Sequence, residues 1–233
     1  MSYKTVCVAG GGVLGSQIAF QAAYCGFDVT IWLRSEGSIG RTQHKIDHVR
    51  EEYIAAIEGM ADGTGEWCAG IADSDRPFDK EVALAAVERA YSTLKLELDL
   101  AKAVADADLV IESMAEDAQA KIDFYKKLAP VLPQKTVVVT NSSTLLPSTF
   151  AKYTGRPEKY LSLHFANSIW KNNMTEVMAQ DQTDKRYFDE LVDFANDIRM
   201  LALPVNKEKN GYLLNSMLVP WLLSGLDLYV SGV

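Results

Sequence analysis

The sequence has few cysteines and no clustered ones. Cys7, Cys25 and Cys68 are the three in 233 residues, and none belongs to a C-x-x-C pair. Disulfide frameworks and cysteine zinc sites need closely spaced pairs, so neither is expected, and a reducing compartment fits this usage. We expect no metal site.

Positive charge is also scarce. Lys and Arg number 23 against 31 Asp and Glu, which gives a net charge of -8. Phosphate-rich partners are usually bound by basic surfaces, so nucleic acid and anionic membranes are disfavoured as partners. A small-molecule substrate is the expected partner.

Long apolar runs are missing. The most apolar stretch, 213–230, is interrupted by Asn215, Pro220 and Asp227, which disfavours a membrane span. The N-terminus has no apolar segment followed by a small-residue cleavage site. These patterns predict a cytoplasmic protein, and the 48% hydrophobic and 23% charged content is typical of a folded one.

Short apolar stretches alternate with helical periodicity along most of the chain, which predicts an α/β fold with a Rossmann-type, doubly wound sheet. Two strands flanking the loop around Trp170 are expected to form a terminal antiparallel hairpin. We assign 1–206 to this nucleotide-binding domain. Strands are expected at 5–9, 28–33, 108–112, 136–140, 161–165, 175–178 and 202–205, and helices at 16–25, in two pieces between 40 and 100 around a loose insertion at 59–77, and at 121–128 and 187–199.

Residues 207–233 are expected to begin an all-α C-terminal domain. The stretch 211–230 reads as a helix that is apolar nearly all round. Such a helix should be buried against another domain or subunit, so we expect a homodimer.

A glycine turn joins the first expected strand to the first helix. Gly10, Gly12 and Gly15 form G-x-G-x-x-G, which permits a tight turn, close approach of the backbone to a pyrophosphate and close packing of helix on strand. The same glycines could form a turn without a ligand. The strand, turn and helix context favours binding of NAD or NADP, with Val13 and Leu14 at the helix start among the contacts.

The end of the second expected strand bears on the choice of cofactor. An acid that binds the ribose 2′-hydroxyl is typical there for NAD, but the sequence has Leu33 followed by Arg34 and Ser35. Arg34 could pair with the 2′-phosphate of NADP. Alternatively Arg34 is a solvated loop residue and Glu36 supplies the acid. The missing acid favours NADP.

Polar residues follow one of the later expected strands directly. Asn141, Ser142, Ser143 and Thr144 come directly after 136–140, where they could face a ligand or cap a helix.

His164 lies in an apolar strand, and Glu176 lies about equally far from the centre of the expected hairpin. A carboxylate beside an imidazole orients the ring and stabilises its charged form, which suits proton transfer during hydride transfer. The alternative is a core histidine bound to backbone carbonyls.

Several ordered motifs resemble one family over nearly the whole chain. The glycine turn, NSST at 141–144, HFAN at 164–167, TEVM at 175–178 and KNGYLLNSMLVP at 209–220 are similar to the 3-hydroxyacyl-CoA dehydrogenase family. Within it, GVLGSQIAF, TNSSTLLPS and HFAN followed by NN and EVM most resemble the diketoreductases, which act on dicarbonyl compounds.

The resemblance implies roles for individual residues. His164 matches the catalytic histidine, Glu176 its glutamate partner, and Ser143 the serine that hydrogen-bonds the substrate oxygen. It also implies further contacts with the cofactor and the substrate. Asn215 joins the catalytic set, because it matches an asparagine that contacts the same region as Ser143, and it also belongs with Asn167 to the implied substrate set. Glu116, Lys121 and Asn141 belong to the implied cofactor set.

Departures from the family leave the substrate open. The proline that usually follows H-F-x-N is replaced by Ser168 beside Trp170, and 59–77 is longer than usual, in a region the family uses near CoA. The resemblance also implies a longer helical region than 207–233. We therefore expect a dehydrogenase of 3-hydroxyacyl-CoA type, with two alternatives: a reductase or hydroxy-acid dehydrogenase acting on free substrates, and a catalytically silent, crystallin-like dinucleotide-binding protein.

Overall fold

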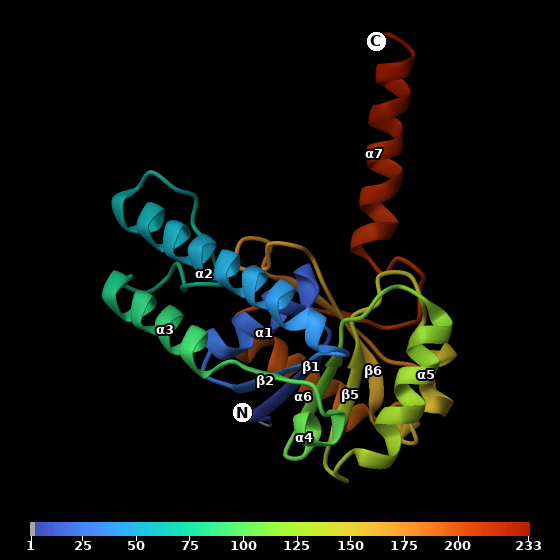
Figure 1. The fold of residues 1–233 in the computed structure, drawn as a ribbon. Coiled ribbons are helices and arrows are strands. Elements are labelled where there is room, and N and C mark those ends of the chain that lie inside the picture. Colours follow the sequence, from blue (N-terminus) through green and yellow to red (C-terminus); the bar gives the residue numbers. More distant parts are fainter. Residues whose placement is uncertain (1–2) are drawn as a thin grey trace.

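Eight strands form one sheet in the order β3-β2-β1-β4-β5-β6-β7-β8 in the computed structural model, which describes residues 3–233 (Figure 1). All neighbours are parallel except the antiparallel β6 and β7. The fold is therefore α/β with a mostly parallel sheet, as the sequence predicts. The strands are β1 Thr5–Ala9, β2 Asp28–Trp32, β3 Lys95–Glu97, β4 Leu109–Glu112, β5 Val137–Thr140, β6 Tyr160–Phe165, β7 Met174–Met178 and β8 Leu201–Val205.

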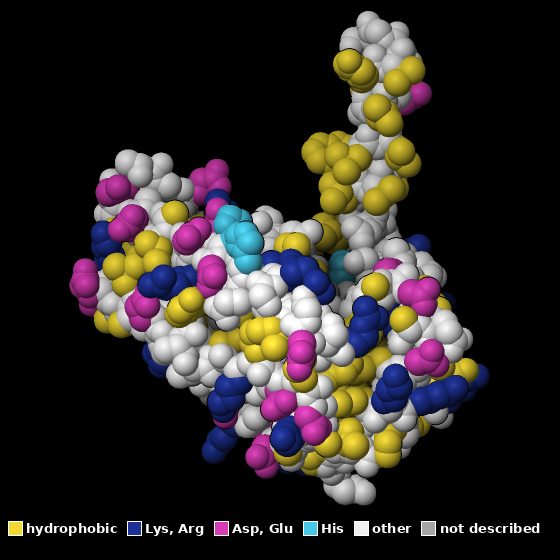
Figure 2. All heavy atoms as spheres, viewed as in Figure 1, with side chains coloured by type: hydrophobic (Ala, Val, Ile, Leu, Met, Phe, Trp, Pro, Cys, Tyr) yellow, Lys and Arg dark blue, Asp and Glu magenta, His cyan; other side chains and the backbone are white. Residues whose placement is uncertain are grey.

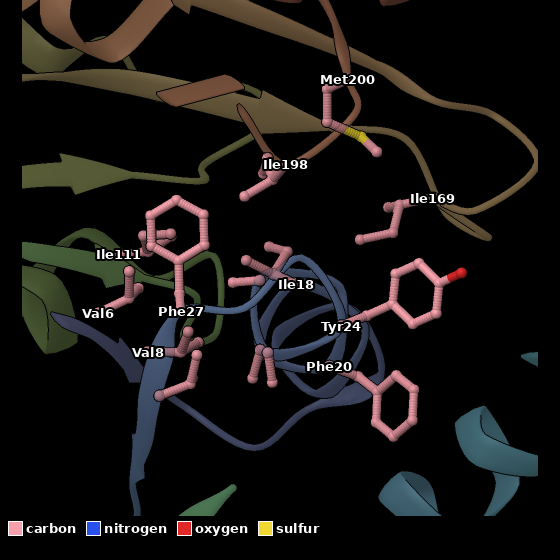
Figure 3. Packing of buried hydrophobic residues seen from close by; sticks show 14 of the residues in the cluster. Val6, Val8, Ile18, Phe20, Tyr24, Phe27, Ile111, Ile169, Ile198 and Met200 are labelled. Atoms are coloured by element: carbon pink, nitrogen blue, oxygen red, sulfur yellow. The ribbon is translucent and has the colours of Figure 1, made fainter. Parts of the chain in front are cut away.

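Helices cover both faces of the sheet, because the strands bury side chains on both sides. In β1, Val6 and Val8 belong to one core cluster and Cys7 and Ala9 to another. Helix α1 packs on the first cluster, where Ile18 points toward the sheet (Figure 3). The α-helices are α1 Val13–Tyr24, α2 Ile39–Asp62, α3 Lys80–Thr93, α4 Leu100–Val104, α5 Ala118–Leu128, α6 Lys185–Asp197 and α7 Leu214–Val230.

Three details differ from the expectations. The short edge strand β3 lies where only helical periodicity was expected, and the short helix α4 lies between residue 100 and the next expected strand, where no element was expected. The hairpin of β6 and β7 is not terminal, because α6 returns the chain so that β8 pairs parallel to β7 at the edge of the sheet. Finally, α7 starts at Leu214 instead of 211, because Gly211 and Tyr212 have φ of 78° and 51°, outside the right-handed helical region.

Helix α7 projects away from the sheet and its helices (Figure 1). Hydrophobic side chains cover it (Figure 2), and Trp221 and Tyr229 are 73% and 81% exposed. The expected burial of this helix is therefore not achieved within this chain. No helix in the described part is both long and apolar enough to cross a membrane.

Candidate active site

The glycine turn lies at the carboxyl end of β1 and opens α1. Gly10 has φ of 121°, and a Cβ there would lie 2.5 Å from the carbonyl oxygen of Ser113. A Cβ on Gly15 would lie 2.0 Å from the carbonyl oxygen of Gly10, whereas one on Gly12 would meet nothing within 4 Å. Two glycines thus close the turn, and the third leaves open backbone at the helix N-terminus, where free amides favour a phosphate.

A cavity of about 310 Å³ lies beside this turn, against the end of β2. Its lining includes Gly12, Arg34, Ser38, Arg41 and Lys45. Leu33 is buried and cannot accept a hydrogen bond from a ribose through its side chain. Glu36, the alternative acid, is not among the lining residues. The cavity wall that would face an adenosine ribose is therefore cationic.

A second cavity of about 450 Å³ continues over the helix start toward the ends of β4 and β5. The two cavities share Gly12, Ser113, Met114 and Ala115. Together they form one groove across the carboxyl ends of the central strands, where ligands bind in such sheets. The second cavity is lined by Gly12, Val13, Leu14, Gly15, Ser113, Met114, Ala115, Glu116, Asn141, Ser143 and Thr144.

Glu116 fixes the loop that carries Ser143. Its Oε1 accepts hydrogen bonds from Ser142 Oγ at 2.5 Å, Thr144 N at 2.9 Å and Thr144 Oγ1 at 2.8 Å. Burial tends to raise the pKa of Glu116, but these donors and Lys121 outweigh it and hold the pKa below its usual value. Glu116 therefore stays ionised and holds the residues on both sides of Ser143. The helix-cap interpretation of this segment fails, because only the 3-10 turn Pro147–Thr149 follows it.

Lys121 lies beneath this loop and is 1% exposed. Its Nζ lies 2.7 and 2.8 Å from the two carboxylate oxygens of the buried Glu112, and 3.6 Å from Glu116 Oε2. Lys121 thus lines neither cavity and reaches the groove only through Glu116. Asn141 is also engaged by the protein, since its Oδ1 accepts from Phe165 N at 3.0 Å.

His164 and Glu176 are directly paired across β6 and β7, as the hairpin reasoning predicts. His164 Nδ1 lies 2.7 Å from Glu176 Oε2, and His164 Nε2 lies 3.2 Å from Ser143 Oγ. A carboxylate at Nδ1 makes that nitrogen the proton donor of the neutral ring, so Nε2 is left as the base. The base therefore faces Ser143, at the edge of the groove.

Glu176 also binds the start of α7. Its Oε1 accepts from the backbone amides of Leu213 and Leu214 at 2.7 and 2.8 Å. Burial tends to raise the pKa of this carboxyl, but the hydrogen bond from His164 and the two amides outweigh it and lower the pKa. Glu176 is thus a buried, ionised group with three donors.

The remaining expected residues, Asn167 and Asn215, line neither cavity of the groove. Asn167 is exposed in the loop after β6, and its carbonyl accepts from Asn172 Nδ2. Asn215 lies in the first turn of α7, next to Leu214, and lines neither cavity of the groove. Trp170 is 3% exposed and packs on Tyr53 of α2, with ring centroids 5.2 Å apart. It is therefore a core residue.

A larger cavity, about 650 Å³, lies between α1, α3 and the segment 71–79. Its lining includes Tyr24 and Cys25, at the C-terminal end of α1, and the ion pair of Arg199 with Asp73. Because α1 runs back from the carboxyl ends of the strands, this cavity opens at the opposite edge of the sheet. We assign no functional residue to this cavity.

The groove, the open helix N-terminus and the oriented acid–base pair define a dinucleotide-binding oxidoreductase domain. The profile of the 3-hydroxyacyl-CoA dehydrogenase NAD binding domain matches residues 5–209. The chain therefore belongs to this family, whose members are NAD-dependent enzymes acting on CH–OH groups.

Individual relatives cover the whole chain. Human mitochondrial hydroxyacyl-coenzyme A dehydrogenase is 28% identical over 230 residues, 98% of this chain and 67% of that protein. The 3-hydroxybutyryl-CoA dehydrogenase of Clostridioides difficile is 28% identical over 228 residues, 98% of this chain and 72% of that protein. A solved diketoreductase, described as acting on dicarbonyl compounds, is 40% identical, with a TM-score of 0.83, over 100% of this chain and 74% of its own.

Two features of the site were not predicted from the sequence. Ser142 and Thr144 donate hydrogen bonds to Glu116, which lies 26 and 28 residues away in the chain. Tyr212 stacks on His164, with ring centroids 4.6 Å apart. The sequence places Tyr212 directly after Gly211 at the start of a helix. This position indicates a turn, but it does not indicate which residue the Tyr212 ring contacts.

Proposed function

We propose that this chain carries the acid–base and cofactor-binding residues of a dehydrogenase that interconverts 3-hydroxy and 3-keto groups. The observation that supports this most is the ordered set of Glu176, His164 and Ser143 at the edge of a groove that begins at the glycine turn. When bound, the nicotinamide supplies or accepts the hydride. The protein's task is to orient the substrate and move one proton.

In the oxidation direction, His164 Nε2 takes the proton from the substrate hydroxyl, and in reduction it returns that proton. The imidazolium formed in between is stabilised by the ionised Glu176 at Nδ1. Ser143, 3.2 Å from Nε2, marks where the substrate oxygen can contact both groups, and its hydroxyl donates to the oxygen as negative charge develops. We assign Asn215 as a second donor and Asn167 to substrate contacts farther from the reacting carbon.

We further propose that the cofactor is NADP in preference to NAD. Residues 33–35, directly after β2, include no acid, Glu36 does not line the cavity beside the glycine turn, and Arg34 lines it together with Arg41, Lys45 and Ser38. A guanidinium can pair with a 2′-phosphate through two charge-assisted hydrogen bonds. Arg41 already donates to Ser38 Oγ at 3.3 Å, which leaves Arg34 as the residue best placed for the phosphate.

Two substrate classes fit the reaction: acyl-CoA thioesters and free dicarbonyl compounds. The named acyl-CoA relatives are 28% identical and the diketoreductase is 40% identical, which favours the free dicarbonyl class. The third possibility, a silent dinucleotide-binding protein, is opposed by the intact geometry of His164, Glu176 and Ser143.

The test is turnover of acetoacetyl-CoA and of a 3,5-diketo ester, each with NADH and NADPH. We expect turnover with NADPH, faster on the diketo ester. No turnover on either substrate, with NADPH binding intact, would instead identify a silent binding protein.

A further inference from the structure

The turn between β8 and α7 places an aromatic ring on the proposed catalytic histidine. The Tyr212 and His164 rings are stacked, with centroids 4.6 Å apart and planes inclined by 21°. Tyr212 is 1% exposed. The imidazole is thus held at Nδ1 by Glu176, faces Ser143 at Nε2 and is covered on one face by this ring.

The backbone that presents Tyr212 is strained. Its φ is 51°, in the left-handed region that a bulky residue rarely occupies, and it follows Gly211 with φ of 78°. Such conformations persist where the surroundings hold them, and they concentrate at functional sites. Here the next two amides, those of Leu213 and Leu214, bind the Glu176 carboxylate that also binds His164.

The hydroxyl of Tyr212 contributes little to this arrangement. It is buried and makes no hydrogen bond to His164, Glu176 or Ser143 among the described residues, although the Ser162 hydroxyl lies close enough to act on its pKa. Burial raises the pKa of Tyr212 and outweighs the Ser162 hydroxyl, which tends to lower it, and the nearby carboxylates Glu116 and Glu176 raise it further, so the group stays un-ionised. The ring, and not the hydroxyl, is therefore the part that acts on His164.

We propose that Tyr212 is a positioning residue for the His164–Glu176 pair. Its ring fixes the plane of the imidazole so that Nδ1 meets Glu176 while Nε2 faces Ser143 and the substrate oxygen. This inference rests on the proposed function, because positioning matters only if His164 moves a proton.

The kinetic test compares Tyr212→Leu, which removes the ring, with Tyr212→Phe, which removes only the hydroxyl. A stacked aromatic pair contributes enough free energy beyond simple burial to change the ratio of correctly oriented to misoriented imidazole about two- to tenfold. We expect kcat to fall about that much in Tyr212→Leu with the KM for cofactor unchanged, and to stay within about twofold of wild type in Tyr212→Phe. Equal kcat in wild type and Tyr212→Leu would overturn the proposal.

Val205→Ala is the matched control, because Val205 packs in the same small cluster as Tyr212 and has no contact with His164 among the described interactions. It should lower the melting temperature and leave kcat unchanged. A loss of kcat equal to that of Tyr212→Leu would reduce Tyr212 to a packing role and overturn the proposal. If Tyr212→Leu does not fold, Tyr212→Met fills the space with a flexible chain and takes its place.

A second measurement does not depend on turnover. The protein has three histidines, and the other two, His44 and His48, are exposed on α2 and serve as internal references in ¹⁵N spectra of the imidazoles. Wild type and Tyr212→Phe should show one neutral His164 tautomer, protonated at Nδ1, whereas Tyr212→Leu should show a mixture or a broadened signal. Identical His164 spectra in all three would refute the positioning role, even if wild type proves inactive and the proposed function itself fails.

Discussion

Replacing Glu176 by Gln should reverse the tautomer of His164. Glu176 has three donors: His164 Nδ1 at 2.7 Å on one oxygen, and the amides of Leu213 and Leu214 at 2.7 and 2.8 Å on the other. A glutamine has a single carbonyl oxygen, which two backbone donors hold in place. Its NH₂ group must then face Nδ1, so the neutral ring carries its proton on Nε2 and can no longer accept one from the substrate.

The expected loss of kcat is large, because the substitution removes both the reactive tautomer of His164 and the negative charge of Glu176. Acid–base catalysis typically contributes about 10²- to 10⁴-fold to the rate. In a Ser-His-Asp triad, replacing the carboxylate by an amide lowers kcat by about 10⁴-fold, the upper end of that range. We therefore expect Glu176→Gln to lower kcat by about 10²- to 10⁴-fold, measured by following NADPH absorbance. Glu88→Gln, at a surface ion pair on α3 with Arg50, is the control and should leave kcat unchanged.

The same change has a pH signature in stability. The pKa of Glu176 is lowered in the folded state, so its carboxylate contributes stability above the pKa of the unfolded chain and loses it as the pH falls through the folded value. The stability difference between wild type and Glu176→Gln should therefore be largest near neutral pH and shrink in acid, as followed by urea unfolding. A loss of kcat under about fivefold, or a stability difference that grows in acid, would refute this role of Glu176.

Two further predictions concern the cofactor and the assembly. Arg34→Ala should weaken NADPH binding about ten- to a hundredfold and leave NADH binding unchanged. Because Arg34 is exposed, we expect the loss to lie toward the lower end of that range. Fluorescence titrations at fixed salt measure both dissociation constants. Wild type that binds NADH as tightly as NADPH would contradict it. We also propose that 207–233 begins a helical domain that forms a homodimer through the exposed apolar side chains of α7. Wild type should therefore sediment as a dimer at micromolar concentration, and Leu222→Glu should sediment as a monomer. A monomeric wild type would show that α7 does not pair in this way.

The sequence predicted those parts of the fold that depend on local signals. The first strand, the glycine turn and α1 were found because strand, turn and helix signals follow one another within 24 residues. The pair of His164 and Glu176 was found because a hairpin with a loop of known length nearly fixes the register. By contrast, β3 has three residues, too few for periodicity to separate it from the helices on either side.

What the sequence could not predict depends on long-range packing. Trp170 was predicted only to lie in a loop, but its ring packs on Tyr53 of α2, 117 positions earlier, and is buried. The contact of Tyr212 with His164 depends on a left-handed turn 48 positions after the histidine. Neither contact leaves a local pattern, because the two partners lie on elements that meet only in the folded sheet.

His164→Gln tests the central claim most directly, because His164 should act on the substrate and not on the dinucleotide. We predict that turnover of the preferred substrate falls at least about 10²-fold while the Kd for NADPH stays within about twofold of wild type. If the variant keeps more than half of the wild-type turnover, or if it loses NADPH binding in parallel with turnover, His164 is not the group that moves the proton.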